Sequence, residues 1–146
     1  MSTLKDKSKM NLKAALLLTS EVDLCPTSVH CAYYSCYQLI IYFLETKLKL
    51  SDIERNKAYG RYKRDVRETG GTKILGSHEF WITQFINDYR VKKPAEVLSL
   101  YYDLSQLRQA RLAADYKTTD YDKDQTDALC EKALRITKMI TKTYES

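Results

Sequence analysis

Apolar residues recur between positions 29 and 45 so densely that they predict a helix buried on most sides. Wound at about 100° per residue, they cover more than half of the circumference, whereas a surface helix needs only about 100°. The polar stripe that remains is narrow and consists of Ser35, Gln38, Tyr42, Glu45 and Thr46. Pro26 and Ser28 form a start signal. We interpret residues 28 to about 48 as the central helix of a bundle, with tyrosine hydroxyls reaching polar partners; the alternative is that its tyrosines, cysteines and histidine form a site.

The spacing of apolar residues predicts four further helices. The first covers about Lys5–Glu21, the third begins near Ser77 as its N-cap, the fourth covers 95–116 and the fifth about 123–143. The apolar stripe of the first helix is Met10, Ala14, Leu17 and Leu18, and that of the third is Trp81, Ile82, Phe85 and Tyr89. The fifth helix has Leu129, Ala133, Ile136 and Ile140. The 146 residues include only four glycines and two prolines, too few for the turns of a β-rich protein. We therefore predict one domain, residues 1–146, that is an all-α, up-and-down bundle of about five helices.

A basic stretch separates the second and third of these helices, at about residues 46–75. It holds nine lysines and arginines against four acidic residues, and so accounts for the whole net charge of +5. A connection of this length inside a compact domain is usually functional or disordered. Four cations interleaved with Tyr59 and Tyr62 are candidates for binding phosphates, while the two tyrosines could stack on unpaired bases. The cations are Arg61, Lys63, Arg64 and Arg67. The alternative is a solvated, mobile loop without a ligand, and we expect about 55–75 to be protease-sensitive.

Charged residues continue an apolar stripe on the predicted helix at 95–116. Val97, Leu100, Tyr101, Leu104 and Leu107 gather on one side, and the same side then carries Arg108, Arg111 and Asp115. In one interpretation the helix leaves the bundle there, and Arg111 and Asp115 form an intrahelical ion pair. In the other, the arginines line a groove or subunit interface that holds a phosphate or a carboxylate.

Cysteine spacing and composition exclude several classes of protein. The four cysteines contain no C-x-x-C pair, and a metal cluster of Cys25, His30, Cys31 and Cys36 would match no familiar zinc spacing. Buried free thiols in a reducing compartment are the preferred interpretation. No apolar run is long enough for a membrane span, and no cleavage-site pattern follows the basic N-terminus. We expect a cytoplasmic protein with no metal, no other cofactor and no membrane contact.

Four segments in order resemble a HEPN domain: "HCAYYSCYQLIIYFL", "GSHEFWITQF", "LYYDLSQLRQARLAADY" and "TDALCEKALRITKMI". They are most similar to the small, single-domain members of bacterial and archaeal toxin–antitoxin and defence systems. The resemblance implies an up-and-down helical bundle that is commonly a homodimer. It also implies a metal-independent ribonuclease motif, in which an arginine is followed by four to six residues and a histidine, with a tyrosine two positions later in the toxin branch.

Mapped onto this chain, the resemblance makes Arg108 the motif arginine and Tyr116 the motif tyrosine. Ala114 stands where the motif has its histidine. Arg111 is a second arginine without a following histidine, and His78 lies where family members often open a helix with histidine. Because alanine cannot transfer a proton, we expect a degenerate ribonuclease that binds RNA or a protein partner through an arginine-lined groove.

Two other hypotheses stay open. One is an active ribonuclease toxin whose unorthodox site combines Arg108, Arg111 and Tyr116 with His78 from another helix. In that branch of the family, the partner is a nucleotidyltransferase that silences the toxin by modifying the tyrosine. The other is a non-catalytic interaction scaffold. In each case we expect a homodimer, in which arginine and aspartate pair across a two-fold interface.

Overall fold

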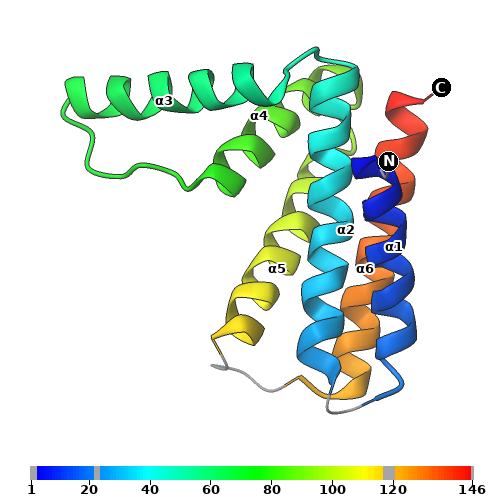
Figure 1. The fold of residues 1–146 in the computed structure, drawn as a ribbon. Coiled ribbons are helices and arrows are strands. Elements are labelled where there is room, and N and C mark those ends of the chain that lie inside the picture. The colour runs from blue at the N-terminus through cyan, green and yellow to red at the C-terminus, as the bar shows by residue number, and fades with distance from the viewer. Residues whose placement is uncertain (1–2, 22–23, 117–120, 146) are drawn as a thin grey trace.

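The computed structural model describes residues 3–21, 24–116 and 121–145, and these residues form six helices (Figure 1). In chain order they are α1 (Leu4–Leu18), α2 (Cys25–Thr46), α3 (Asp52–Glu68), α4 (Ser77–Lys92), α5 (Val97–Asp115) and α6 (Lys123–Tyr144). Helices α1, α2, α5 and α6 lie side by side as a bundle, and α4 packs against α2 and α5. The predicted all-α bundle is confirmed, with one helix more than expected.

Helix α2 is the central member of the bundle, as its apolar pattern predicts. It packs against α1, α4, α5 and α6, and Tyr33, Ile40, Phe43 and Leu44 on it are completely buried. Burial of each such side chain stabilises the fold by about 1.5–3 kcal/mol. Because α2 has neighbours on nearly every side, its polar groups must find partners inside the molecule.

Helix α1 presents a different face to α2 from the one expected. Met10 and Leu17 are 66% and 63% exposed, whereas Ser8 and Ala15 are buried. The reason is that small residues let the two helices approach closely, and the buried hydroxyls then bond to backbone carbonyls. Ser8 Oγ donates to the carbonyl oxygen of Ser35 at 2.5 Å, and Ser28 Oγ donates to that of Ala15 at 2.7 Å.

The helix ends follow local capping chemistry with one correction. Thr3 forms a capping box with Asp6 at the start of α1, and Asp122 forms one with Gln125 at the start of α6. Ser77, expected as the N-cap of α4, is instead its first helical residue, and Gly76 is the N-cap. The shift by one residue places His78 in the first turn of α4.

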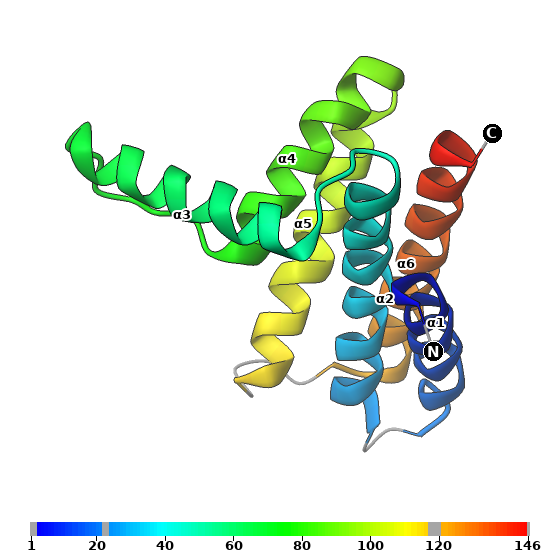
Figure 2. The same cartoon turned by 45° about the horizontal axis from the view of Figure 1, so that its top comes forward.

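The basic stretch is not a loop throughout, since residues Asp52–Glu68 form α3. This helix projects from the side of the bundle, and residues 69–76 return along it to α4 (Figures 1 and 2). Ser51 caps α3 by accepting a hydrogen bond from the Glu54 backbone N–H at 3.2 Å. The sequence S-D-I-E at 51–54 is the signal that would have predicted this helix. Gly70, with φ 77°, turns the chain back at its end.

A buried arginine attaches the base of α3 to the bundle. Arg55 is only 8% exposed, and its Nη1 donates to Glu45 Oε1 at 2.8 Å and to the Leu50 carbonyl oxygen at 2.9 Å. Further along, Tyr59 donates to the Leu75 carbonyl oxygen at 2.8 Å, and the ring of Tyr62 stacks on Phe80 at 4.6 Å. The helix is therefore held at both its base and its returning segment.

Substitution of Arg55 by methionine is expected to loosen α3. Loss of charge-assisted hydrogen bonds that a buried guanidinium makes costs about 1.5–3 kcal/mol. Urea unfolding should show this loss, and limited trypsin digestion should cut the 52–76 segment faster than in the wild type. Arg61→Met, on the exposed side of the same helix, is the matched control. It should change neither the free energy of unfolding in urea nor the rate at which trypsin cuts the segment. Equal stability of the two variants would contradict the anchoring role.

Candidate functional site

A histidine from α4 meets the tyrosines of α2. His78 Nδ1 lies 2.9 Å from the hydroxyl oxygen of Tyr33, and its ring stacks on that of Tyr37 with centroids 3.8 Å apart. Burial raises the pKa of Tyr33 well above its ordinary value, so its hydroxyl keeps its proton and can donate to the imidazole. Burial also raises the pKa of Tyr37 to about 12. The contact therefore joins two neutral groups.

Arg111 of α5 lies over two tyrosines of α2, Tyr33 and Tyr34. Its guanidinium carbon lies 5.6 Å from the ring centroid of Tyr33 and 5.3 Å from that of Tyr34, within cation–π range. Its Nη2 donates to the Tyr34 hydroxyl at 3.3 Å. Its Nε lies 2.8 Å from Asp115 Oδ2, which confirms the predicted intrahelical ion pair. The ion pair supports the structural interpretation of this charge cluster, and the functional interpretation stays a prediction.

Asp115 also holds the second histidine of the chain. Its Oδ1 lies 3.3 Å from His30 Nδ1, and the His30 ring lies 4.6 Å from that of Tyr34. The chain has only two histidines, and the fold brings both to one place although they are far apart in sequence. We call the resulting group the arginine–histidine cluster; its members are His30, Tyr33, Tyr34, Tyr37, His78, Arg111 and Asp115, together with Arg108, whose positive charge acts on Tyr33 and His78.

The two arginines shape the electrostatics of the cluster. Burial, followed by the positive charges of Arg111 and Arg108, lowers the pKa of His78 from 6.5 to about 4. His78 is therefore a neutral imidazole at pH 7. An anion placed between the arginines would offset their charge and raise this pKa again, which couples the protonation of His78 to the binding of an anion.

Stability is expected to depend on pH through His78. The folded protein keeps His78 neutral down to about pH 4, whereas the unfolded chain takes up the proton near 6.5. The unfolded state therefore binds more protons in this window, and stability falls as the pH drops through it, by on the order of 1–3 kcal/mol. His78→Phe keeps a ring against Tyr37 but cannot titrate, so urea unfolding should show a shallower pH slope. Equal slopes would contradict a depressed pKa.

The Nε atoms of both arginines lack hydrogen bonds. Arg108 Nε and Arg111 Nε are buried, and neither finds an acceptor among the described residues. The Nε of Arg111 is close to Asp115, but its N–H bond is not directed at the carboxylate. Arg108 also lines a small hollow with Glu79, Thr83, Tyr101, Ser105 and Gln109, of about 130 Å³. Arg111 is still paired with Asp115, whereas Arg108 forms no ion pair with a described residue. A buried charged donor without an acceptor is costly, which favours an oxyanion as the partner of Arg108.

A groove leads from the cluster to the base of α3. It has a volume of about 360 Å³ and is lined by Leu4, Tyr34, Tyr37, Gln38, Ile41, Asp52, Arg55, Asn56, Ser77 and Trp81. Its aromatic walls and side-chain amides combine flat stacking surfaces with hydrogen-bonding groups, and its size lies at the lower end of the range for ligand sites. The groove connects Tyr34 and Tyr37 of the cluster with the base of α3.

The four cations predicted on the basic stretch lie along α3. Arg61, Arg64 and Arg67 are exposed and Lys63 is half-buried, its Nζ 4.6 Å from the ring centroid of Tyr59. None of them forms an ion pair within the part of the chain that the structure describes. Their charges are therefore available to a partner.

The other two motif positions lie outside the cluster. Tyr116 is 75% exposed at the C-terminal end of α5, and its side chain contacts none of the described residues through a hydrogen bond or a ring. Ala114 is only 5% exposed and packs with Val29 and Ala110. A histidine at position 114 would therefore have to displace the packing between α5 and α2, which makes Ala114→His a poor route to a proton-transfer group.

The tyrosine-rich segment of α2 is core, as predicted, and it also contributes to the candidate site, which we had kept only as the alternative. We assigned function to the predicted helix at 95–116, to the basic stretch and, in one hypothesis, to His78, yet α2 contributes four members of the cluster. A signal was present, because His30, Tyr33, Tyr34 and Tyr37 share one face of a helix at i, i+3, i+4 and i+7. What the sequence could not show is that this face meets His78 and Arg111.

Comparisons with family models, with curated proteins and with solved structures find no match to this chain. Within the described residues, no three histidine, cysteine, aspartate or glutamate side chains converge as metal ligands would, and all four cysteines are free thiols. No helix in the described ranges is long and apolar enough to cross a bilayer.

Proposed function

We propose that this protein binds single-stranded RNA, with one phosphodiester held at the arginine–histidine cluster. The observation that carries the proposal is that Arg111 lies over stacked tyrosines beside a neutral histidine, and that Arg108, whose charge acts on the same histidine, has a buried Nε donor without an acceptor among the described residues. Guanidinium groups bind phosphate oxygens with directed hydrogen bonds. The HEPN resemblance, which we retain as part of the proposal, aligns Arg108 with the arginine of an RNA-cleaving motif.

The groove and α3 extend this binding site along a strand. The half-buried tyrosine rings in the groove offer stacking surfaces to unpaired bases, and the four cations of α3 would then contact the phosphates along the strand. Bases in a duplex are already stacked on each other and cannot enter such a groove. We therefore expect a preference for single strands.

Fluorescence anisotropy with a labelled RNA of about 12 nucleotides tests the proposal. The same sequence as a duplex and as single-stranded DNA provides the comparison, and each titration is repeated between about 50 and 200 mM salt. Binding should be tightest for single-stranded RNA and should weaken steeply with salt. No binding at the lowest salt concentration would overturn the proposal.

A second candidate function is metal-independent cleavage of that RNA, favoured by the presence of both histidines. Cleavage requires a base that removes the ribose 2′-hydroxyl proton, so that the oxygen attacks phosphorus. It also requires an acid that protonates the departing 5′-oxygen, which leaves a 2′,3′-cyclic phosphate and a 5′-hydroxyl. Asp115 would orient His30, Tyr33 would orient His78, and the positive charges of Arg108 and Arg111, which already act on His78, would stabilise the negative charge that develops on the phosphate. The two imidazoles supply the proton transfer that Ala114 cannot.

This second function corresponds to a ribonuclease toxin of a toxin–antitoxin pair, with a nucleotidyltransferase as its partner and the exposed Tyr116 as the residue modified. Incubation of RNA with the protein in EDTA, with end-group analysis of the products, tests it. His30→Gln and His78→Gln should each reduce cleavage about 10²–10⁴-fold while leaving binding within a few-fold. If the RNA stays intact and bacteria that express the protein alone grow normally, the protein is not a ribonuclease toxin. Its function would then be to bind RNA or a protein partner without cleavage.

A homodimer is part of the proposal, but for a different reason from the one expected. Arg111 and Asp115 pair within one chain, so they need no partner across a two-fold axis. Instead, Leu98, Tyr101 and Tyr102 of α5 are 76%, 47% and 61% exposed and offer an apolar surface. Light scattering should show a dimer, and Leu98→Glu should convert it to a monomer. A monomeric wild type at tens of micromolar would contradict this.

A further inference from the structure

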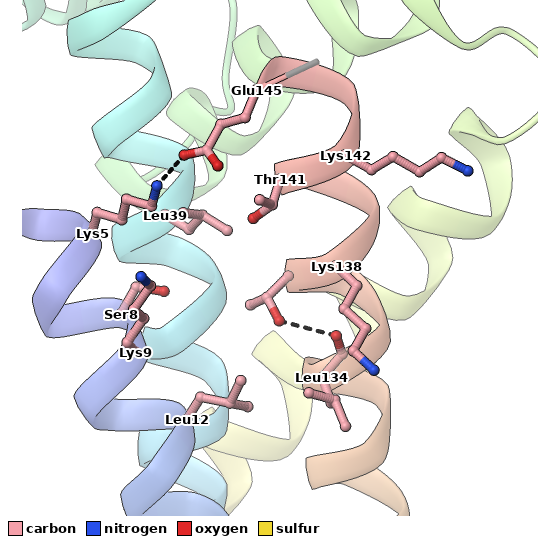
Figure 3. A pocket seen from close by; sticks show the side chains of 11 residues that line it. Lys5, Ser8, Lys9, Leu12, Leu39, Leu134, Lys138, Thr141, Lys142 and Glu145 are labelled. Atoms are coloured by element: carbon pink, nitrogen blue, oxygen red, sulfur yellow. Dashed lines mark hydrogen bonds and ion pairs between the residues drawn. The ribbon is translucent and has the colours of Figure 1, made fainter.

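A second groove lies on the opposite side of α2, between α1 and α6. Figure 3 shows its apolar floor, formed by Leu12 of α1, Leu39 of α2 and Leu134 of α6. Its volume is about 430 Å³. None of its lining residues belongs to the arginine–histidine cluster, so a ligand of this groove would bind whether or not the cluster holds RNA.

Lysines rim this groove on both sides. Lys9 from α1 and Lys138 and Lys142 from α6 line it, and none of the three forms an ion pair or a side-chain hydrogen bond with a described residue. At one end, Lys5 pairs with Glu145 and links α1 to the end of α6 (Figure 3). The groove is therefore apolar at its floor and uncompensated in positive charge along its rim.

We propose that this groove binds an acidic amphipathic helix of a partner protein. The groove follows α6 from Leu134 to Glu145, a length of about 16 Å at 1.5 Å per residue, which is three turns of a guest helix. Leucines at the floor match apolar residues at i, i+3 or i+4, and i+7 of the guest. Lys138 and Lys142, one turn apart, match carboxylates that are also one turn apart on its flanks.

The charge of the rim identifies the occupant. A second copy of this chain, with a net charge of +5, would bring like charges together unless a locally acidic face were used, whereas an acidic helix neutralises the rim. Electrostatic complementarity of this kind raises association rates and excludes basic competitors. An apolar floor distinguishes the groove from a site for phosphates alone, because a phosphate gains nothing from Leu12 and Leu134.

Selection from a displayed peptide library tests the proposal. Each peptide has about 14 residues, leucine at the i, i+3 or i+4, and i+7 positions, and glutamate, lysine, glutamine or alanine at random elsewhere. Peptides that bind the wild-type protein should be enriched in glutamate over lysine next to the leucines. Recovered peptides should bind the Lys138→Glu/Lys142→Glu variant at least 10-fold more weakly, as measured by anisotropy.

The matched control is Lys57→Glu/Lys73→Glu, which changes the net charge equally but lies outside the groove, and should leave the affinity within about two-fold. Circular dichroism and urea unfolding check that both variants are folded. Enrichment without a charge preference, equal weakening in both variants, or failure to recover a binder would overturn the proposal. Sodium laurate that binds in the groove when no peptide does would also overturn it, in favour of an anionic amphiphile. Loss of RNA binding with intact peptide binding would affect the proposed function alone.

Discussion

Replacing Arg108 and Arg111 together by glutamine is expected to lower the affinity for single-stranded RNA by about 100-fold or more. Each guanidinium would lose charge-assisted hydrogen bonds to a phosphate, worth about 1.5–3 kcal/mol. The fold should survive, because neither side chain is part of the apolar core and Asp115 retains His30 as a partner. Fluorescence anisotropy measures the affinity, and urea unfolding confirms that the variant is folded.

The matched control for this pair is Arg90→Gln/Lys93→Gln. Both residues are exposed near the end of α4, and the only side-chain contact described for either is one of 3.5 Å between Arg90 and Asn87. The control removes the same charge and should change affinity only a few-fold, through the general field of the protein. If the two double variants bind RNA equally, the cluster is not the phosphate site. If Arg111→Gln alone accounts for the whole loss, Arg108 serves a different role.

Removal of the positive charges of α3 is expected to change the salt dependence of RNA binding. For single strands, each phosphate contact contributes about 0.7 to the slope of log K against log salt. Four substitutions to glutamine should therefore lower the slope by about 3, and the affinity at about 0.1 M salt by 10²–10³-fold. The positions are Arg61, Lys63, Arg64 and Arg67.

Folding should be nearly unchanged in this variant, because the four side chains form no ion pair with a described residue. A control variant with four exposed lysines elsewhere replaced by glutamine removes the same charge; its positions are Lys7, Lys13, Lys47 and Lys93. A slope that falls equally in both variants would show that the effect comes from net charge and that the cations of α3 do not contact the RNA phosphates. A slope that is unchanged in the α3 variant would remove α3 from the binding surface.

Local patterns in the sequence predicted most of the helices and one part of the site. The apolar pattern of α2 predicted a central helix, because a chain segment that is apolar on most sides is stable only when neighbours cover it. The i, i+4 spacing of Arg111 and Asp115 predicted their ion pair. The helix α3 was missed although Ser51 and Glu54 form a capping signal, because the charges and the length of the connection suggested a loop.

The sequence by itself determined what depends on neighbours within a turn or two: helical periodicity, caps, the positive charge of residues 46–75, and which residues share a face. Only the tertiary structure decided that His30 on α2, His78 on α4 and Arg111 on α5 meet around Tyr33 and Tyr34. That meeting depends on the packing of three helices whose contacts join residues far apart in the chain. Burial also decided the chemistry, since the lowered pKa of His78 arises from desolvation and from charges on another helix.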